Sequence, residues 1–207
     1  MTTQTRKLRL VLASQSPRRR ELLSAAGFEF DLSPTQISEI PDENLNLEGQ
    51  IRALACQKAE ACLKSGKVAK GQGNLILSAD TVVVLDGQIL GKPDDRRENE
   101  HYLRLLSGRT HCVITSVALL DVDTGRMAVG HETSWITFRT LTDDEIAAYV
   151  ASGEGLDKAG GYGIQGSAGA FVSEVKGPYD NIVGLPVALV EKLLKENNWD
   201  VDRRKSQ

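Results

Sequence analysis

Apolar residues recur along the chain with two spacings, every second residue and every third to fourth residue, which predict strands and helices respectively. The clearest helix covers residues 47–64, where the apolar residues share one face. These residues are Ile51, Leu54, Ala55 and Cys62. By the same signals, strands are expected over 28–32, 75–85, 88–90, 111–120 and 127–138, and further helices begin at Pro17, Asp94, Thr142 and Pro186.

Glycines dominate residues 153–184, and the part over 156–166 fits neither a regular strand nor a stable helix. Glycine permits unusual backbone angles and the close approach of a ligand, so this part is a candidate binding loop. After it we expect a hairpin of strands 170–175 and 179–183 across Gly177-Pro178. Residues 200–207 are expected to fray. With no internal repeat and no linker, residues 1–207 are predicted to form a single domain.

The turn before the first helix carries the first candidate chemistry. An apolar run from Leu8 breaks at Ser14, and Ser16 is a good N-cap for a helix whose first turn holds Arg18 and Arg19. Hydroxyls, guanidinium groups and the N–H groups of a helix N-terminus together suit an anion. A basic surface turn would explain the same residues, and this stretch alone does not separate the two interpretations.

A lysine interrupts the apolar face of the helix over 47–64. Lys58 follows Leu54 by four residues and Ile51 by seven, which places it on that face. Its aliphatic stem could cover the apolar surface while the ammonium group reaches water. In the other interpretation, Lys58 points into a cleft and meets an anion there.

A carboxylate interrupts the apolar strand over 75–85. Asp80 is costly to bury in such a strand unless it is paired or binds a metal. The Asp86-Gly87 dipeptide predicts a two-residue hairpin turn. In the register that this turn implies, Thr81 lies opposite Lys92, one residue from Asp80. Two interpretations therefore remain: Asp80 and Lys92 form a structural ion pair, or they belong to a functional site.

Composition narrows the class of protein. The 207 residues are 41% hydrophobic, enough for a substantial core, and the net charge of 25 − 28 = −3 argues against a large basic surface for nucleic acid or membrane. Three cysteines without a Cys-x-x-Cys pair suit reduced thiols. No apolar run approaches the roughly 20 residues that span a bilayer, and the first residues lack the apolar region expected of a signal peptide. We therefore expect a cytoplasmic protein.

Three segments together resemble the signatures of one family. They are Leu-Ala-Ser-Gln-Ser-Pro-Arg-Arg at 12–19, Ala-Asp-Thr at 79–81 with Gly-Lys-Pro at 91–93, and Asp-Lys-Ala-Gly-Gly-Tyr-Gly-Ile-Gln-Gly at 157–166. In their order and their residues they resemble the signature motifs of the Maf nucleotide pyrophosphatases, and the similarity extends from about residue 8 to residue 194. The Ala-Asp-Thr and Tyr-Gly-Ile-Gln-Gly motifs resemble those of the branch that acts on dTTP and UTP.

The resemblance implies hydrolysis of a nucleoside triphosphate between its α- and β-phosphates, which releases the monophosphate and pyrophosphate. It implies an α/β fold with a central mixed, elongated and twisted sheet flanked by helices, and two closely packed lobes with a deep cleft. It also implies a divalent metal cation, Mg²⁺ or Mn²⁺, and a homodimer. Two alternatives are a non-catalytic nucleotide-binding regulator of cell division and a pyrophosphatase for modified nucleotides such as 7-methyl-GTP.

The resemblance also assigns roles to individual residues. The catalytic residues would be Asp80, Lys58 and Lys92. The substrate-binding residues would be Ser14, Arg18, Arg19, Thr81 and Gln165. The metal ligands would be Asp80 and Glu39, the latter in the loop after the first helix and its short strand. A glutamine beside a tight glycine loop suits a pyrimidine edge, because its amide offers both a donor and an acceptor.

Overall fold

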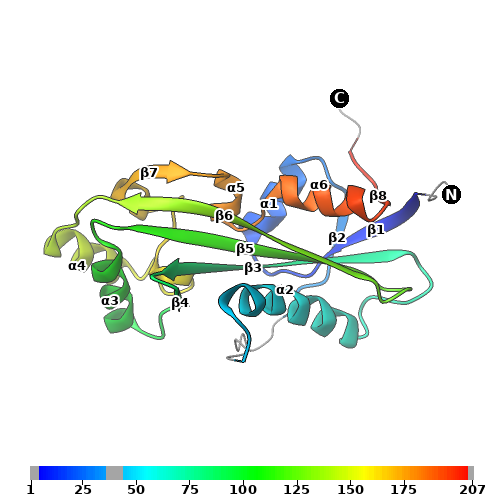
Figure 1. Ribbon diagram of the computed structural model, residues 1–207, viewed down its shortest axis with the longest axis horizontal. Helices are drawn as coiled ribbons and strands as arrows, with labels where there is room; N and C mark the ends of the chain where they lie inside the picture. The colour runs from blue at the N-terminus through cyan, green and yellow to red at the C-terminus, as the bar shows by residue number, and fades with distance from the viewer. Residues whose placement is uncertain (1–4, 36–43, 205–207) are drawn as a thin grey trace. The chain divides into compact units, whose positions relative to one another are not determined.

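Strands and helices alternate along most of the chain in the computed structural model, which describes residues 5–35 and 44–204 (Figure 1). In chain order they are β1 (Arg6–Leu12), α1 (Pro17–Ala25), β2 (Phe30–Leu32), α2 (Leu47–Lys64), β3 (Asn74–Leu85), β4 (Gln88–Leu90), α3 (Arg96–Leu106), β5 (Thr110–Asp121), β6 (Met127–Phe138), α4 (Asp143–Ser152), the 3-10 helices η1 (Ala159–Gly161) and η2 (Ser167–Phe171), β7 (Val172–Lys176), α5 (Tyr179–Val183), α6 (Val187–Glu196) and β8 (Trp199–Val201).

The strands form an eight-stranded mixed sheet in the order β2-β1-β3-β5-β6-β7, with β4 beside β3 and β8 beside β1. β1 runs parallel to β2, β3 and β8, whereas β4 is antiparallel to β3 and β7 is antiparallel to β6. Helices flank this sheet. The predicted α/β class with a mixed sheet is therefore confirmed.

The chain divides into two compact units. Unit 1 contains residues 1–80, 115–132 and 184–207, and unit 2 contains residues 81–114 and 133–183. β3, β5 and β6 each contribute residues to both units. Neither unit is a continuous stretch of sequence, so both depend on chain segments that are far apart in the sequence.

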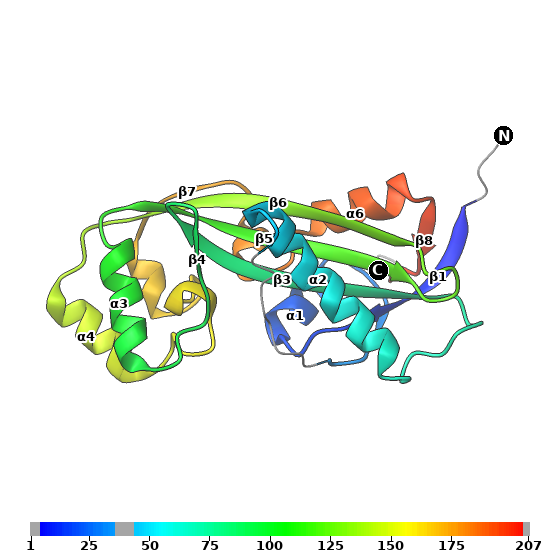
Figure 2. The same ribbon diagram turned by 60° about the horizontal axis from the view of Figure 1, so that its bottom comes forward.

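Unit 1 has helices on both faces of its strands, as Figure 1 shows. Leu8, Leu10 and Leu12 of β1 lie in a core with α1 and α6, whereas Val11 and Ala13 lie in a second core with α2. This division follows from the two-residue period of a strand, which sends successive side chains to opposite faces. In the view of Figure 2, α2 lies across the strands of this unit.

Unit 2 has one core, in which α3 and α4 pack side by side (Figure 1). Aromatic rings meet edge to face at its centre: Phe138 lies 4.8 Å from Tyr162 and 5.9 Å from Phe171 between ring centroids. The Thr142 capping box predicted for α4 is present, since Thr142 Oγ1 accepts from Glu145 N and the Glu145 carboxylate accepts from Thr142 N.

Two predictions about the C-terminal part of the chain are wrong. Residues 179–183 form the helix α5 and not a strand, and β7 pairs with β6 in the register Ile136–Val175. The tail does not fray at Asp200, because β8 pairs with β1 and Arg204 N donates to Gly27 O at 2.7 Å. Within the described residues, no helix is long and apolar enough to cross a membrane.

Candidate active site

The turn between β1 and α1 is held by its own hydroxyl groups. Ser16 caps α1 by accepting a hydrogen bond from Arg19 N at 3.4 Å, and Pro17 is the first helical residue. Ser14 is 8% exposed, and its Oγ accepts from Ser16 N at 3.2 Å and from Arg19 Nη1 at 3.4 Å. Three of the predicted substrate-binding residues, Ser14, Arg18 and Arg19, thus share one ordered helix start.

Arg19 also ties this turn to a distant part of unit 1. Its Nε donates to Gly184 O at 2.7 Å, in the segment that leads into α6. Part of the Arg19 guanidinium is therefore engaged by protein groups, and Arg18, on the preceding position of the helix, is partly exposed. Of the two arginines, Arg18 is the better placed to meet a ligand.

The packing of α2 on the sheet explains the site around Lys58. Ile51 O accepts from Ser116 Oγ of β5 at 2.7 Å, and one turn later Ala55 O accepts from Ser78 Oγ of β3 at 2.7 Å. Lys58 is on the next turn of the same face of α2. The side chain two residues after Ser78 on β3 points to the same face of the strand. That residue is Asp80.

Lys58 and Asp80 form a buried ion pair. Lys58 Nζ bonds Asp80 Oδ1, and the residues are 9% and 4% exposed. The position of Lys58 on the buried face of α2 is confirmed. The sequence suggested Lys92 of the hairpin as a partner for Asp80; the structure pairs Asp80 with Lys58 of α2. A charge pair at this depth is costly to desolvate and is weak evidence for a purely stabilising role. It is therefore a candidate reaction centre.

Thr81, Lys92 and Gln165 belong to unit 2. The hairpin register is confirmed from Leu85–Gln88 to Val83–Leu90, where β4 ends. Beyond that point the chain leaves the strand, and Gly91 O accepts from Gly160 N at 2.8 Å. The predicted alignment of Thr81 with Lys92 lies outside the paired residues; Thr81 is half-buried and Lys92 is exposed.

Residues 155–167, here called the glycine loop, carry Gln165 on an exposed position. Gly160 has a φ of +67°, and a Cβ there would lie 2.6 Å from Val83 Cγ2, so only glycine fits. The prediction that this segment is neither strand nor regular helix is confirmed, apart from the 3-10 turn η1 and the start of η2.

Four side chains that sequence reasoning did not assign to the site hold the glycine loop: Asn99, His111, Tyr149 and Glu154. Asn99 Nδ2 donates to Gly161 O at 2.7 Å, and His111 Nε2 lies 2.7 Å from Tyr162 Oη. Burial lowers the pKa of His111 to about 4. Only their tertiary neighbours give these four residues a role, so no local motif could have identified them.

The donor groups near Asp80 suit a cation only in part. Glu39, the other predicted metal ligand, lies outside the described residues. Within 5–35 and 44–204, no group of three or more His, Cys, Asp or Glu side chains could hold a metal ion. A single carboxylate fits Mg²⁺ or Mn²⁺ only when substrate phosphates complete the coordination, which is how Mg²⁺ is usually held in nucleotide enzymes.

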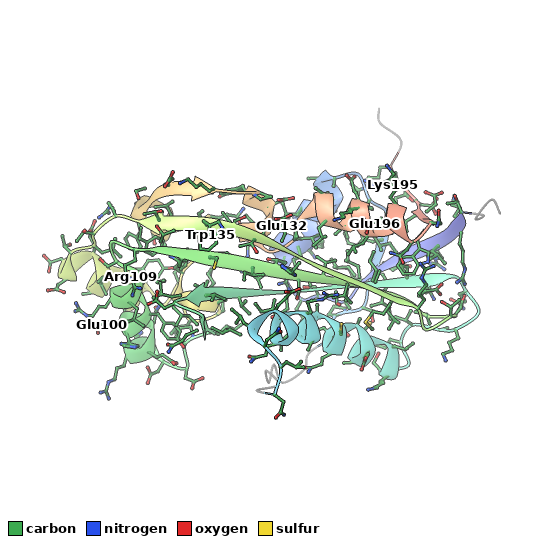
Figure 3. The ribbon with its side chains drawn as sticks, viewed as in Figure 1. Glu100, Arg109, Glu132, Trp135, Lys195 and Glu196 are labelled. Atoms are coloured by element: carbon green, nitrogen blue, oxygen red, sulfur yellow. The ribbon has the colours of Figure 1, made fainter. Side chains whose placement is uncertain are left out.

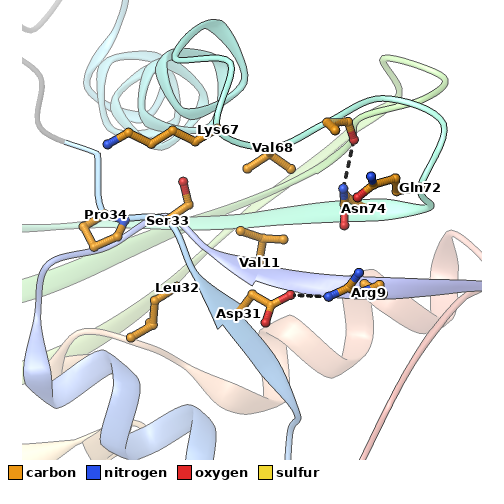
Figure 4. A pocket seen from close by; sticks show the side chains of 11 residues that line it. Arg9, Val11, Asp31, Leu32, Ser33, Pro34, Lys67, Val68, Gln72 and Asn74 are labelled. Atoms are coloured by element: carbon orange, nitrogen blue, oxygen red, sulfur yellow. Dashed lines mark hydrogen bonds and ion pairs between the residues drawn. The ribbon is translucent and has the colours of Figure 1, made fainter.

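A groove of about 540 Å³ in unit 1 contains none of the predicted site residues that the structure describes (Figure 4). Some of its polar groups are paired within the protein: Arg9 Nη2 lies 2.8 Å from Asp31 Oδ2, and Asn74 Nδ2 donates to Ala69 O at 2.9 Å. Because the groove holds none of the predicted site residues that the structure describes, it is not the candidate active site.

Comparison with known proteins agrees with the signatures. The sequence matches the family described as Maf-like protein over residues 9–197. The "dTTP/UTP pyrophosphatase" of Bdellovibrio bacteriovorus is 50% identical over 187 residues, which cover 90% of this chain and 97% of the relative. The protein of the same name from Moorella thermoacetica is 48% identical over 194 residues, which cover 93% of this chain and 97% of the relative.

A solved structure of a nucleoside-triphosphatase / dITP/XTP pyrophosphatase from Mycobacterium abscessus also matches, with a TM-score of 0.40 and 15% identity over 70% of this chain and 94% of that one. A similarity at this TM-score supports no conclusion about fold or function. The family match and the relatives instead extend over most of this chain and nearly the full length of the relatives. The chain belongs to the Maf family.

Proposed function

We propose that the protein hydrolyses dTTP and UTP to the nucleoside monophosphate and pyrophosphate. The observation that carries the proposal is the 50% identity, over 90% of this chain, to a relative named dTTP/UTP pyrophosphatase. The Ala-Asp-Thr motif at 79–81 and the Tyr-Gly-Ile-Gln-Gly motif at 162–166 support the same substrates.

In this proposal water attacks the α-phosphorus, and the bond from that phosphorus to the bridging oxygen breaks. Pyrophosphate leaves with the bonding electrons, and the proton from water passes to the Asp80 carboxylate. Lys58 fixes the orientation of that carboxylate through the buried ion pair. A general base must lie within hydrogen-bond reach of the proton it accepts, and a fixed carboxylate meets that requirement at little reorganisation cost.

The remaining predicted residues would bind the substrate. Arg18 and Lys92 would neutralise phosphate oxygens, and Ser14 and Arg19 would keep the start of α1 in place for them. Thr81 and Gln165 would select the base and sugar. Asp80 would also hold Mg²⁺ or Mn²⁺ together with substrate phosphates, and the ion would supply charge neutralisation at the triphosphate.

The test is product analysis in 18O-labelled water with dTTP, UTP and 7-methyl-GTP, with Mg²⁺ or Mn²⁺. Attack at the α-phosphorus places the label in the monophosphate and leaves the pyrophosphate unlabelled. Labelled pyrophosphate, or orthophosphate alone, would refute the reaction type. A preference for 7-methyl-GTP would refute the substrate. Binding of dTTP and UTP without turnover would favour the non-catalytic regulator.

We further expect a cytoplasmic homodimer, as is expected for this family. Light scattering at several protein concentrations measures the oligomeric state. A molar mass that stays near the 22.5 kDa of one chain would refute the dimer.

A further inference from the structure

The glycine loop is held on the side that precedes Gln165 by side chains of α3, β5 and α4. Asn99 and His111 contact Gly161 and Tyr162 as described, and Gly163 N donates to Tyr149 Oη at 3.2 Å. Burial raises the pKa of Tyr149, and the nearby Glu154 carboxylate adds to that effect. The backbone is thus fixed as far as two residues before Gln165.

On the other side of Gln165, the loop is held by a backbone hydrogen bond from Gly166 N to Gly163 O at 3.0 Å and by one carboxylate. Glu154 Oε2 accepts from Ser167 N at 3.2 Å and from Ser167 Oγ at 2.7 Å. Its Oε1 packs against Gly166, where a Cβ would lie only 1.7 Å from that oxygen. A Cβ directly after Gln165 would therefore displace the Glu154 carboxylate from its place beside the loop.

Glu154 is itself held in place. Its backbone N donates to Ser152 Oγ at 3.2 Å, and its carbonyl oxygen accepts from Lys158 Nζ at 2.6 Å. A fixed carboxylate that accepts two hydrogen bonds from one residue is a strong anchor, since charge-assisted hydrogen bonds are about twice as strong as neutral ones. Gln165 thus lies between two fixed points, Gly163 and Ser167.

We infer that Glu154 is a positioning residue for base selection: it fixes the backbone that follows Gln165, at Gly166 and Ser167. The inference rests on the proposed function, in which Gln165 reads the base. Uracil and thymine present a carbonyl at C4 and an N–H at N3, whereas cytosine presents an amino group and a ring nitrogen there. An amide distinguishes these edges only when it is held within about 0.5 Å of the reading position.

The experiment compares kcat/KM for pyrophosphate release from UTP and CTP. In Glu154→Gln, which keeps the size of the side chain, the UTP-to-CTP ratio should fall about tenfold, the effect of one lost hydrogen bond to a charged group. Ser167→Ala, which keeps the N–H bond, should lower the ratio less. Glu100→Gln is the matched control, because Glu100 is an exposed carboxylate of α3 in the same unit that pairs with Arg104 (Figure 3).

A merely structural role would lower kcat/KM for both nucleotides alike and leave their ratio unchanged, in Glu154→Gln and in Ser167→Ala. That result with an active wild-type protein would overturn the inference and leave the proposed function intact. A wild-type protein that releases no pyrophosphate would overturn both. Amide hydrogen exchange at Ser167 gives a readout without nucleotide: exchange should accelerate in Glu154→Gln, and unchanged protection would also overturn the inference.

Discussion

Replacement of Asp80 by Asn removes one charge from the buried pair with Lys58 and changes the shape of the side chain little. The side chains of Lys58 and Asp80 are 11% and 5% exposed, so neither charge can recover its hydration without moving. The ammonium group of Lys58 would remain under α2 without a carboxylate partner. The substitution therefore tests the pair and the proposed proton acceptor together.

Breaking a buried ion pair by removal of one partner costs about 3–5 kcal/mol of the free energy of unfolding. Asn can still accept a hydrogen bond from Lys58, so we expect the lower end, about 3 kcal/mol. The fold should survive, because domains are stable by about 5–15 kcal/mol. The double variant Asp80→Asn with Lys58→Met leaves no buried charge and should recover about 2 kcal/mol of that loss.

Urea unfolding measures these differences. Trp199 is buried in unit 1, which holds the pair, whereas Trp135 of β6 is 49% exposed (Figure 3). In a Trp135→Phe background, the fluorescence therefore reports the unit with the pair. Asp31→Asn is the matched control: the Arg9–Asp31 side chains are 60% and 59% exposed, and an exposed pair contributes less than about 1 kcal/mol.

Pyrophosphate release on the same variants separates catalysis from stability. Asp80→Asn and the double variant should both lack turnover, although the double variant is the more stable of the two. The losses in free energy of unfolding caused by Asp80→Asn alone and by Lys58→Met alone are summed and compared with the loss in the double variant. If the two values agree within about 0.5 kcal/mol, Lys58 and Asp80 do not interact as described. Turnover restored in the double variant would show that Asp80 is not the proton acceptor.

Two further variants test the glycine loop and its support. Gly160→Ala should lower the free energy of unfolding by about 2–4 kcal/mol, because its Cβ meets Val83 and its φ is +67°; Gly87→Ala, with a φ of +80° and open space around it, should cost only about 1 kcal/mol, and equal costs in urea unfolding would refute the steric argument. Because burial lowers the pKa of His111 from 6.5 to about 4, the unfolded chain takes up that proton first as the pH falls. The stability from neutral His111 is thus present above pH 6.5 and lost towards pH 4, up to about 3 kcal/mol, so unfolding curves across this range should depend less on pH in His111→Gln than in the wild type.

Elements with a clear apolar face or a characteristic turn dipeptide could be predicted from their own residues. The bounds of α2 follow from its apolar face, and the β3–β4 register follows from Asp86-Gly87, whose φ angles of 50° and 80° suit a type I′ turn. The strand predicted over 179–183 is wrong because this segment, Tyr-Asp-Asn-Ile-Val, is too short for its apolar spacing to distinguish a strand from a helix. Its neighbours, and not its own residues, decide between the two.

In the candidate site, too, the individual residues could be predicted from the sequence, whereas their contacts could not. The phase of α2 placed Lys58 on a buried face, and strand chemistry singled out Asp80. That the two residues meet depends on which face of β3 receives α2, which is set by packing and by the serine hydroxyls of Ser78 and Ser116. The support that Glu154 gives to Gly166 and Ser167 likewise appears only once the loop is folded back on itself.

The pairing of β1 with β8 affects how the protein is made. β1 leaves the ribosome before β8, yet Arg6–Leu8 pair with Trp199–Val201. At about 5–20 residues per second, synthesis of the 199 − 8 = 191 residues from Leu8 to Trp199 takes roughly 10–40 s. During that time the first half of β1 has an unpaired edge, where a nascent strand is open to pairing with other chains. All residues of unit 2 are synthesised before the last segment of unit 1, residues 184–207. β1 is therefore made before the other strands described and is among the last to be fully paired.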